Sequence, residues 1–184
     1  MRRSPKSAAD IRSLTDMEVR APEEVLVKLL AKKHLTLACA ESCTGGMLAS
    51  RIVSVPGASE IFLGGVVSYA NSAKTALLGV SPETLARFGA VSRETACEMA
   101  RGARLRFGAD AALSTTGIAG PGGGTSEKPV GTVWIGFSSE KGEEAAVFHL
   151  TGTDRTGVRT RAVEEALKIM LENTCKLPFK RVII

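Results

Sequence analysis

The sequence contains few of the residues that build metal centres and aromatic cores. Its 184 residues include two histidines, four cysteines, one tryptophan and one tyrosine, and aromatic residues make up 4% of the chain. The cysteines form no C-x-x-C pair, and with two histidines no zinc-binding pattern appears, so we expect no metal site. Because aromatic side chains are scarce, we expect a core of alanine, valine, leucine and isoleucine.

The sequence also lacks the long apolar segments of membrane and secreted proteins. No apolar run approaches the length of a membrane span, and the arginine-rich N-terminus has no apolar signal core. We therefore expect a cytoplasmic protein with free thiols. The net charge of +5 would suit nucleic acid, but part of it lies at the chain ends and basic residues do not alternate with aromatic ones. Neither nucleic acid nor a membrane is expected as a partner.

The hydrophobic pattern predicts one domain at residues 21–176, between a loose leader at 1–20 and an apolar, basic tail at 177–184. Strands alternate with helices, which predicts an α/β fold: a three-layer α/β/α sandwich with a mixed, mostly parallel sheet. The last two strands should form a hairpin. The expected strands are 35–40, 62–69, 111–116, 132–138 and 145–150, and the expected helices begin at 22, 47, 82, 93 and 155.

A turn rich in hydroxyl groups and glycine, Ala40-Glu41-Ser42-Cys43-Thr44-Gly45-Gly46, joins the first strand to a helix. Amides at a helix N-terminus are unpaired and the dipole is positive there, so such a turn binds anions and stabilises an oxyanion. A P-loop is excluded because G-x-x-x-x-G-K-[ST] is absent. Ser42 is the candidate nucleophile, with the amides of Thr44 to Gly46 as oxyanion donors. Cys43 is a rival nucleophile or a small buried residue beneath the turn.

A serine nucleophile needs a base, and lysine is the better candidate here. His34 precedes the first strand, at the end opposite the turn, and His149 lies late in a strand, so a Ser-His-Asp triad is not expected. Lys74 follows the second strand in a segment that can approach Ser42, and a partly desolvated lysine can act as a base. The alternative is that Lys74 is an exposed residue of a helix that begins near Ser72.

Three further polar residues are candidates for the same site. Tyr69 either is a core aromatic residue with a polar tip or lines the pocket, and Asn71 lies between it and the lysine. Thr116 ends a buried strand, where its hydroxyl either orients the nucleophile or the leaving amine, or simply terminates the strand.

A glycine-rich loop follows the third expected strand, and a basic pair opens the last helix. The glycines either let the backbone approach a phosphate closely or only permit a tight turn. The basic pair is Arg155 and Arg159. Cations are disfavoured at a helix N-terminus, so these two arginines indicate a bound anion, unless they form ion pairs with Asp154 or Glu164. The candidates are Gly117, Gly120, Gly123, Gly124, Lys128, Arg155 and Arg159.

Three segments together resemble one known family. They are the Ser42 turn, Gly64-Gly65-Val66-Val67-Ser68-Tyr69-Ala70-Asn71-Ser72-Ala73-Lys74, and the stretch 116–133, which contains Thr116-Gly117-Ile118-Ala119-Gly120-Pro121 and Lys128-Pro129-Val130-Gly131. In this order they resemble the C-terminal domain of the CinA family, which includes nicotinamide-nucleotide amidases. The resemblance runs from about Leu35 to about Glu172.

The resemblance implies an amidohydrolase that converts nicotinamide mononucleotide into nicotinate mononucleotide and ammonia without a cofactor. It implies a serine–lysine pair, Ser42 and Lys74, with Tyr69 lining the pocket, and it implies a homo-oligomer. Thr116 joins these catalytic candidates because of its place at the end of a buried strand. The alternative is a non-catalytic nucleotide-binding or interaction module linked to competence or DNA damage. The expected substrate contacts are Glu41, Cys43, Thr44, Gly45, Gly46, Asn71, the four loop glycines, Lys128, Arg155 and Arg159.

Overall fold

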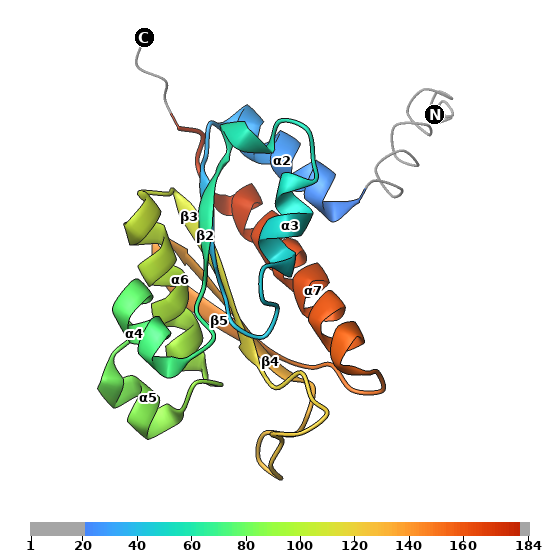
Figure 1. Cartoon of the computed structure of the whole chain (residues 1–184). Helices are drawn as coiled ribbons and strands as arrows, with labels where there is room; N and C mark the ends of the chain where they lie inside the picture. Colours follow the sequence, from blue (N-terminus) through green and yellow to red (C-terminus); the bar gives the residue numbers. More distant parts are fainter. Residues whose placement is uncertain (1–20, 181–184) are drawn as a thin grey trace, which may run out of the picture.

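Five strands form one mixed sheet with helices on both faces (Figure 1). The computed structural model describes residues 21–180. The strands β2, β1 and β3 run parallel, whereas β4 is antiparallel to both β3 and β5, and this confirms the three-layer α/β fold. The strands are β1 (Leu37–Glu41), β2 (Phe62–Val67), β3 (Ala111–Gly117), β4 (Thr132–Ser139) and β5 (Gly142–His149), in the order β2-β1-β3-β4-β5.

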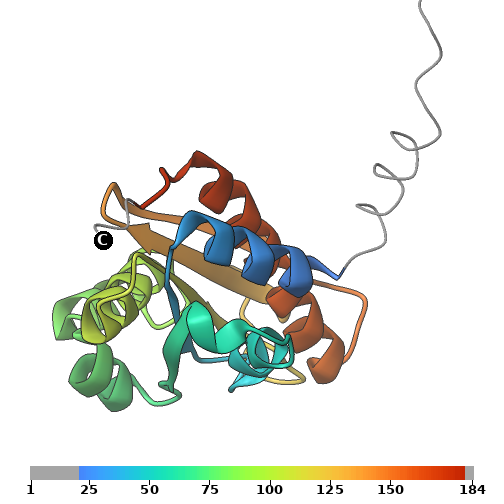
Figure 2. The ribbon, with the colours of Figure 1, turned by 90° about the horizontal axis from the view of Figure 1, so that it is seen from above.

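The helices divide between the two faces of the sheet. Figure 2 shows α2 and α7 on one side and the α4–α6 group on the other. The short helix α3 packs with α2 and α7, and α4 and α5 both pack against α6. The helices are α2 (Pro22–Lys33), α3 (Met47–Val53), α4 (Asn71–Leu78), α5 (Pro82–Phe88), α6 (Arg93–Phe107) and α7 (Arg155–Lys176), with a 3-10 turn, η1 (Ala58–Glu60), before β2.

Local sequence explains where several helices begin and end. Pro22 lies in the first turn of α2, where its missing N–H is not needed. The side chain of Ser92 accepts a hydrogen bond from the Thr95 amide at the start of α6, and Gly108 ends that helix in a left-handed conformation (φ +63°). Asp154 caps α7 in the same way as Ser92 caps α6.

The core is aliphatic, as expected, and the alternation of β1 divides it between the two faces. Leu37 and Cys39 belong to the apolar cluster that β1 shares with α2, α3 and α7. Ala38 and Ala40 belong to the cluster on the α6 side. Because the side chains of a strand alternate between faces, Glu41 continues the first row, and Ser42 follows on the other side.

The observed elements differ from the expected ones in small ways. β1 begins at Leu37, because the amide and hydroxyl of Thr36 both donate to Asp110. The β4–β5 hairpin is tighter than expected, since β5 already begins at Gly142. The expected leader, 1–20, and the end of the tail lie outside the described residues. The described part of the tail packs against the body, where Lys180 Nζ lies 2.9 Å from Asp110 Oδ1.

The three parallel strands end at the same edge of the sheet. Glu41 at the end of β1 lies opposite Val67 of β2 and Thr115 of β3. The segments that follow these strands are the Ser42 turn, the 68–70 link to α4 and the glycine-rich loop. Ligands of open α/β sheets bind at this edge. Within residues 21–180, no helix has the length and apolar composition needed to cross a membrane.

Candidate active site

The Ser42 turn is fixed to its neighbours through backbone and hydroxyl hydrogen bonds. The Ser42 amide donates to the Thr115 carbonyl (2.9 Å), and the hydroxyls of Thr44 and Thr115 lie 2.6 Å apart. Gly45 and Gly46 have φ angles of +58° and +97°, a region in which side chains are strained. The turn therefore needs glycine at both positions to enter α3.

The Lys74 ammonium lies against the Ser42 hydroxyl. Lys74 Nζ is 3.0 Å from Ser42 Oγ, and it also donates to the carbonyls of Ser68 (2.8 Å) and Tyr69 (3.2 Å). Lys74 is 1% exposed and Ser42 is 8% exposed. Lys74 does lie on a helix, but it is buried, so the alternative of an exposed lysine is wrong. Lys74 lies in the first turn of α4, which begins at Asn71, and this places its side chain against Ser68 and Tyr69, the residues that follow β2.

Burial lowers the pKa of Lys74 from its ordinary value of 10.5. In the described part of the chain no carboxylate lies within ion-pair distance of its ammonium. The three acceptors match the three protons of the charged form. Once it loses a proton, the amine can accept the hydroxyl proton of Ser42 across the same 3.0 Å contact, which is the geometry of a base and its nucleophile.

Cys43 is less suited to act as the nucleophile. Burial raises the pKa of its thiol to about 11, so the thiol stays protonated near neutral pH. Cys43 is 5% exposed and belongs to the apolar cluster beneath the turn, although it also borders the pocket. The thiol therefore has the surroundings of a buried structural cysteine.

Glu41 does not line the pocket. Its Oε2 accepts the amides of Gly46 (2.9 Å) and Leu48 (3.0 Å), and its Oε1 accepts the amide of Ala49 (2.9 Å). The start of α3 is thus occupied by a carboxylate of the protein itself, and the Gly46 amide is not available to an oxyanion. The amides of Thr44 and Gly45 have no acceptor among residues 21–180.

A pocket of about 210 Å³ opens beside the Ser42–Lys74 pair. The Arg155 guanidinium borders it, donating to the Tyr69 hydroxyl (3.1 Å) and to the Gly120 carbonyl (2.8 Å). The other arginine, Arg159, donates to the Thr44 carbonyl (2.7 Å) and does not line the pocket. The lining residues are Ser42, Cys43, Tyr69, Lys74, Ala90, Val91, Thr116, Gly117, Ala119 and Arg155.

The remaining candidates are divided between this pocket and more distant positions. The Thr116 hydroxyl donates to the Ala90 carbonyl (2.7 Å), so it joins β3 to the α5–α6 link. Lys128 Nζ donates to the Phe88 carbonyl (2.9 Å), which fastens the glycine-rich loop to the end of α5. Asn71, Gly123 and Gly124 are exposed and lie outside the lining.

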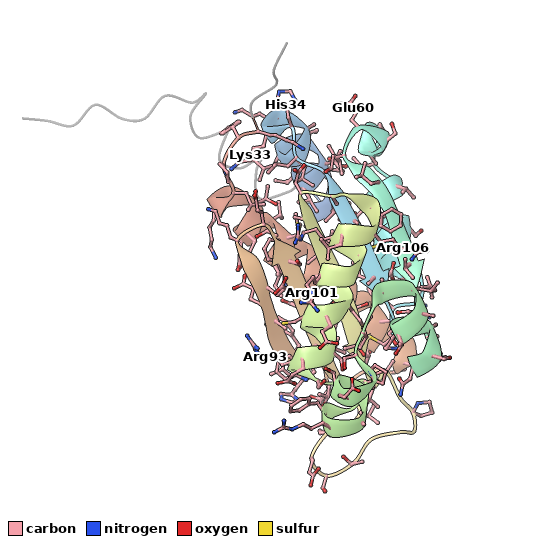
Figure 3. The ribbon with its side chains drawn as sticks, turned by 90° about the vertical axis from the view of Figure 1, so that its left-hand side faces the viewer. Lys33, His34, Glu60, Arg93, Arg101 and Arg106 are labelled. Atoms are coloured by element: carbon pink, nitrogen blue, oxygen red, sulfur yellow. The ribbon has the colours of Figure 1, made fainter. Side chains whose placement is uncertain are left out.

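Sequence reasoning did not identify Ala90 and Val91 as pocket residues. They are ordinary aliphatic residues in a link between helices, and no local motif marks them. The two histidines lie away from the pair. In Figure 3, His34 lies at the same end of the molecule as Lys33 and Glu60, opposite the end that holds α4 and α5. His149 ends β5, the edge strand farthest from β2 in the sheet order.

Comparison with known proteins identifies the family. A model described as the CinA C-terminal domain matches residues 19–174. The chain belongs to the CinA C-terminal domain family. A CinA-like protein of Chlorobium limicola is 55% identical over 133 residues, which are 72% of this chain and 31% of that protein. A CinA-like protein of Chlorobaculum tepidum is 52% identical over 162 residues, which are 85% of this chain and 38% of that protein. The chain thus spans about a third of the length of these curated relatives.

Solved CinA superfamily structures share this fold over nearly their whole length. The competence-damaged protein (CinA) superfamily protein from Escherichia coli is 38% identical, with a TM-score of 0.79 over 83% of this chain and 88% of that one. The Klebsiella pneumoniae superfamily protein is 33% identical, with a TM-score of 0.81 over 85% of this chain and 97% of that one. CinA superfamily proteins of this size therefore contain the same sheet and helical layers.

Proposed function

We propose that this CinA-family chain is an amidohydrolase that deamidates nicotinamide mononucleotide. The observation that carries the proposal is the 3.0 Å contact between the Ser42 hydroxyl and the buried Lys74 amine, both of which line a pocket. That pair suits acyl transfer, because it combines a nucleophile with a base of lowered pKa. The choice of substrate rests on the resemblance to nicotinamide-nucleotide amidases.

In the proposed reaction, neutral Lys74 takes the proton of Ser42 while Ser42 Oγ attacks the carboxamide carbon. The free amides of Thr44 and Gly45 would bind the oxyanion of the tetrahedral intermediate. Lys74 then passes its proton to the amide nitrogen, the C–N bond breaks, and ammonia leaves. Water, deprotonated by Lys74, attacks the acyl-enzyme and releases nicotinate mononucleotide and the serine hydroxyl.

The charges around the pocket orient this substrate in the proposal. Arg155 borders the pocket, and within residues 21–180 no carboxylate pairs with it. An unpaired guanidinium suits a phosphate group. The start of α3, by contrast, already holds the carboxylate of Glu41. We therefore place the 5′-phosphate toward Arg155 and the glycine-rich loop, and the carboxamide at Ser42.

Ammonia release from nicotinamide mononucleotide tests the proposal. The purified wild type and the Ser42→Ala, Lys74→Ala and Cys43→Ala variants would be compared under identical conditions. We expect activity in the wild type and in Cys43→Ala, and a loss of at least about 1,000-fold in the other two. A wild type that releases no ammonia, but whose melting temperature rises with the nucleotide, supports the nucleotide-binding module instead.

A further inference from the structure

The carboxylate of Glu41 is buried at the point where the nucleophile turn enters α3. Glu41 is 1% exposed, and each of its oxygens accepts at least one backbone amide from the first residues of that helix or the glycine before it. Its side chain lies on the α3 side of β1 because it continues the row of Leu37 and Cys39. The next residue, Ser42, points to the other side and meets Lys74.

The helix itself compensates the negative charge of Glu41. Among residues 21–180 no lysine or arginine lies within ion-pair distance of it. Three amide donors and the positive end of α3 take the place of a cation. The Cys39 thiol also faces Oε1 at 3.8 Å, and burial, together with the charge of Glu41, raises the pKa of that thiol well above its ordinary value. The thiol therefore stays protonated and can donate weakly.

Glu41 holds both ends of the short segment that carries Ser42. Its backbone carbonyl accepts the Ser68 amide (2.8 Å), which ties it to the link that also supplies acceptors to Lys74. Its side chain binds Gly46, at the other end of the turn. Only the four residues 42–45 lie between these two attachments, so the Glu41 side chain acts together with the Thr115 contacts of Ser42 and Thr44 to set the position of Ser42 Oγ relative to Lys74.

We propose that Glu41 is a positioning residue for the nucleophile, whose carboxylate fastens the Ser42 turn to the start of α3. The inference rests on the serine–lysine chemistry proposed above. Glu41 touches neither substrate nor reacting atoms in this role. It keeps Ser42 within reach of Lys74 and leaves the Thr44 and Gly45 amides free.

Two substitutions and one matched control test this role. Glu41→Gln keeps the shape and one acceptor oxygen, but it turns an amide group toward a backbone N–H. Glu41→Met removes every acceptor, so the buried amide of Leu48 and the half-buried amides of Gly46 and Ala49 lose their partner. Asp110→Asn is the control, because Asp110 also accepts a backbone amide, from Thr36, but lies at the opposite ends of the same strands.

The decisive readout is the rate at which a fluorophosphonate probe modifies Ser42, followed by intact mass, since this rate needs no turnover of a nucleotide. We expect a decrease of about tenfold for Glu41→Gln and about 100-fold for Glu41→Met, because small displacements of a nucleophile have effects of this size. The kcat for nicotinamide mononucleotide should decrease in parallel, with KM changed by less than about threefold. Asp110→Asn should lower the melting temperature without changing the labelling rate.

Labelling of Glu41→Gln at the wild-type rate overturns the inference, and so does a decrease no larger than that of Asp110→Asn. If Glu41→Met does not fold, Glu41→Gln decides alone. A wild type that is labelled at Ser42 but hydrolyses no nicotinamide nucleotide refutes the proposed substrate. In that case slower labelling of Glu41→Gln still supports the positioning role.

Discussion

Burial of Lys74 makes the stability of the protein depend on pH, and Lys74→Met isolates this effect. Burial lowers the pKa of Lys74 from 10.5, so in the folded chain Lys74 loses its proton at a lower pH than in the unfolded chain. Between the lowered pKa and 10.5 the unfolded state binds more protons, and the free energy of unfolding rises with pH. Below this window the penalty for burying the charge is fully present.

The size of the effect follows from linkage of one proton. The difference in unfolding free energy between the wild type and Lys74→Met should be constant at low pH and then climb by up to about 1.4 kcal/mol per pH unit. Methionine leaves the carbonyls of Ser68 and Tyr69 without their donor, which costs about 1–3 kcal/mol for each group that stays buried. This cost does not vary with pH. It therefore adds a constant to the difference in unfolding free energy between the wild type and Lys74→Met and does not change how that difference depends on pH.

Urea denaturation between about pH 7 and about pH 10 measures the difference directly. Over the same range, log(kcat/KM) of the wild type should rise with a slope of about one and level off where the stability difference begins to climb, because both report the pKa of Lys74. Ser42→Ala should keep the rise in stability while losing activity. A stability difference that is flat or falls with pH refutes the lowered pKa, and two different transition points refute Lys74 as the base.

Three further substitutions test other parts of the structure. Cys43→Ala should keep ammonia release within about threefold of wild type, because burial raises the pKa of this thiol to about 11; a 100-fold loss would contradict this. Arg155→Ala should raise KM for nicotinamide mononucleotide about tenfold more than KM for nicotinamide riboside, which has no phosphate; equal increases in steady-state kinetics would place the phosphate elsewhere. Gly102→Ala should destabilise the protein by about 2–3 kcal/mol in urea denaturation, because a Cβ there would lie 2.0 Å from the Leu78 carbonyl oxygen; a change below about 0.5 kcal/mol would show that α4 and α6 separate easily.

The alternation of strands and helices was predictable because characteristic residues occur where the helices begin and end. Proline and serine at helix starts, and glycine at helix ends, determine elements such as α5 and α6 within a few residues. The start of β1 was less predictable. Leu35 and Thr36 continue its apolar pattern, but the Leu35 amide donates to the Leu30 carbonyl at the end of α2, and the carboxylate of the distant Asp110 binds Thr36.

The contact between Ser42 and Lys74 could be predicted, but the surroundings of the two residues could not. Lys74 lies on a helix whose sequence is compatible with an exposed lysine, and only the pairing of β2 with β1 buries it beside Ser42. For Glu41 a signal did exist. The alternation of Leu37, Cys39 and Glu41 places the carboxylate on the α3 side, away from Lys74, and so indicates a structural role for Glu41 rather than a substrate contact.

The side chains of Glu41 and Ser42 point to opposite sides of the turn. The Glu41 carboxylate and the proposed oxyanion therefore use different backbone amides. A helix N-terminus attracts anions, and without Glu41 the amides of Gly46, Leu48 and Ala49 would be free to attract one behind the turn. With Glu41 bound there, a second anion at α3 would meet a buried negative charge, whereas Arg155 beyond the pocket has none beside it within residues 21–180. In the proposed reaction, an oxyanion at Thr44 and Gly45 differs from a phosphate because it forms only transiently, on the carbonyl oxygen whose carbon Ser42 attacks. In the proposed reaction, a fixed anion behind the turn therefore favours the productive orientation of a phosphorylated amide, at no cost to the two free amides.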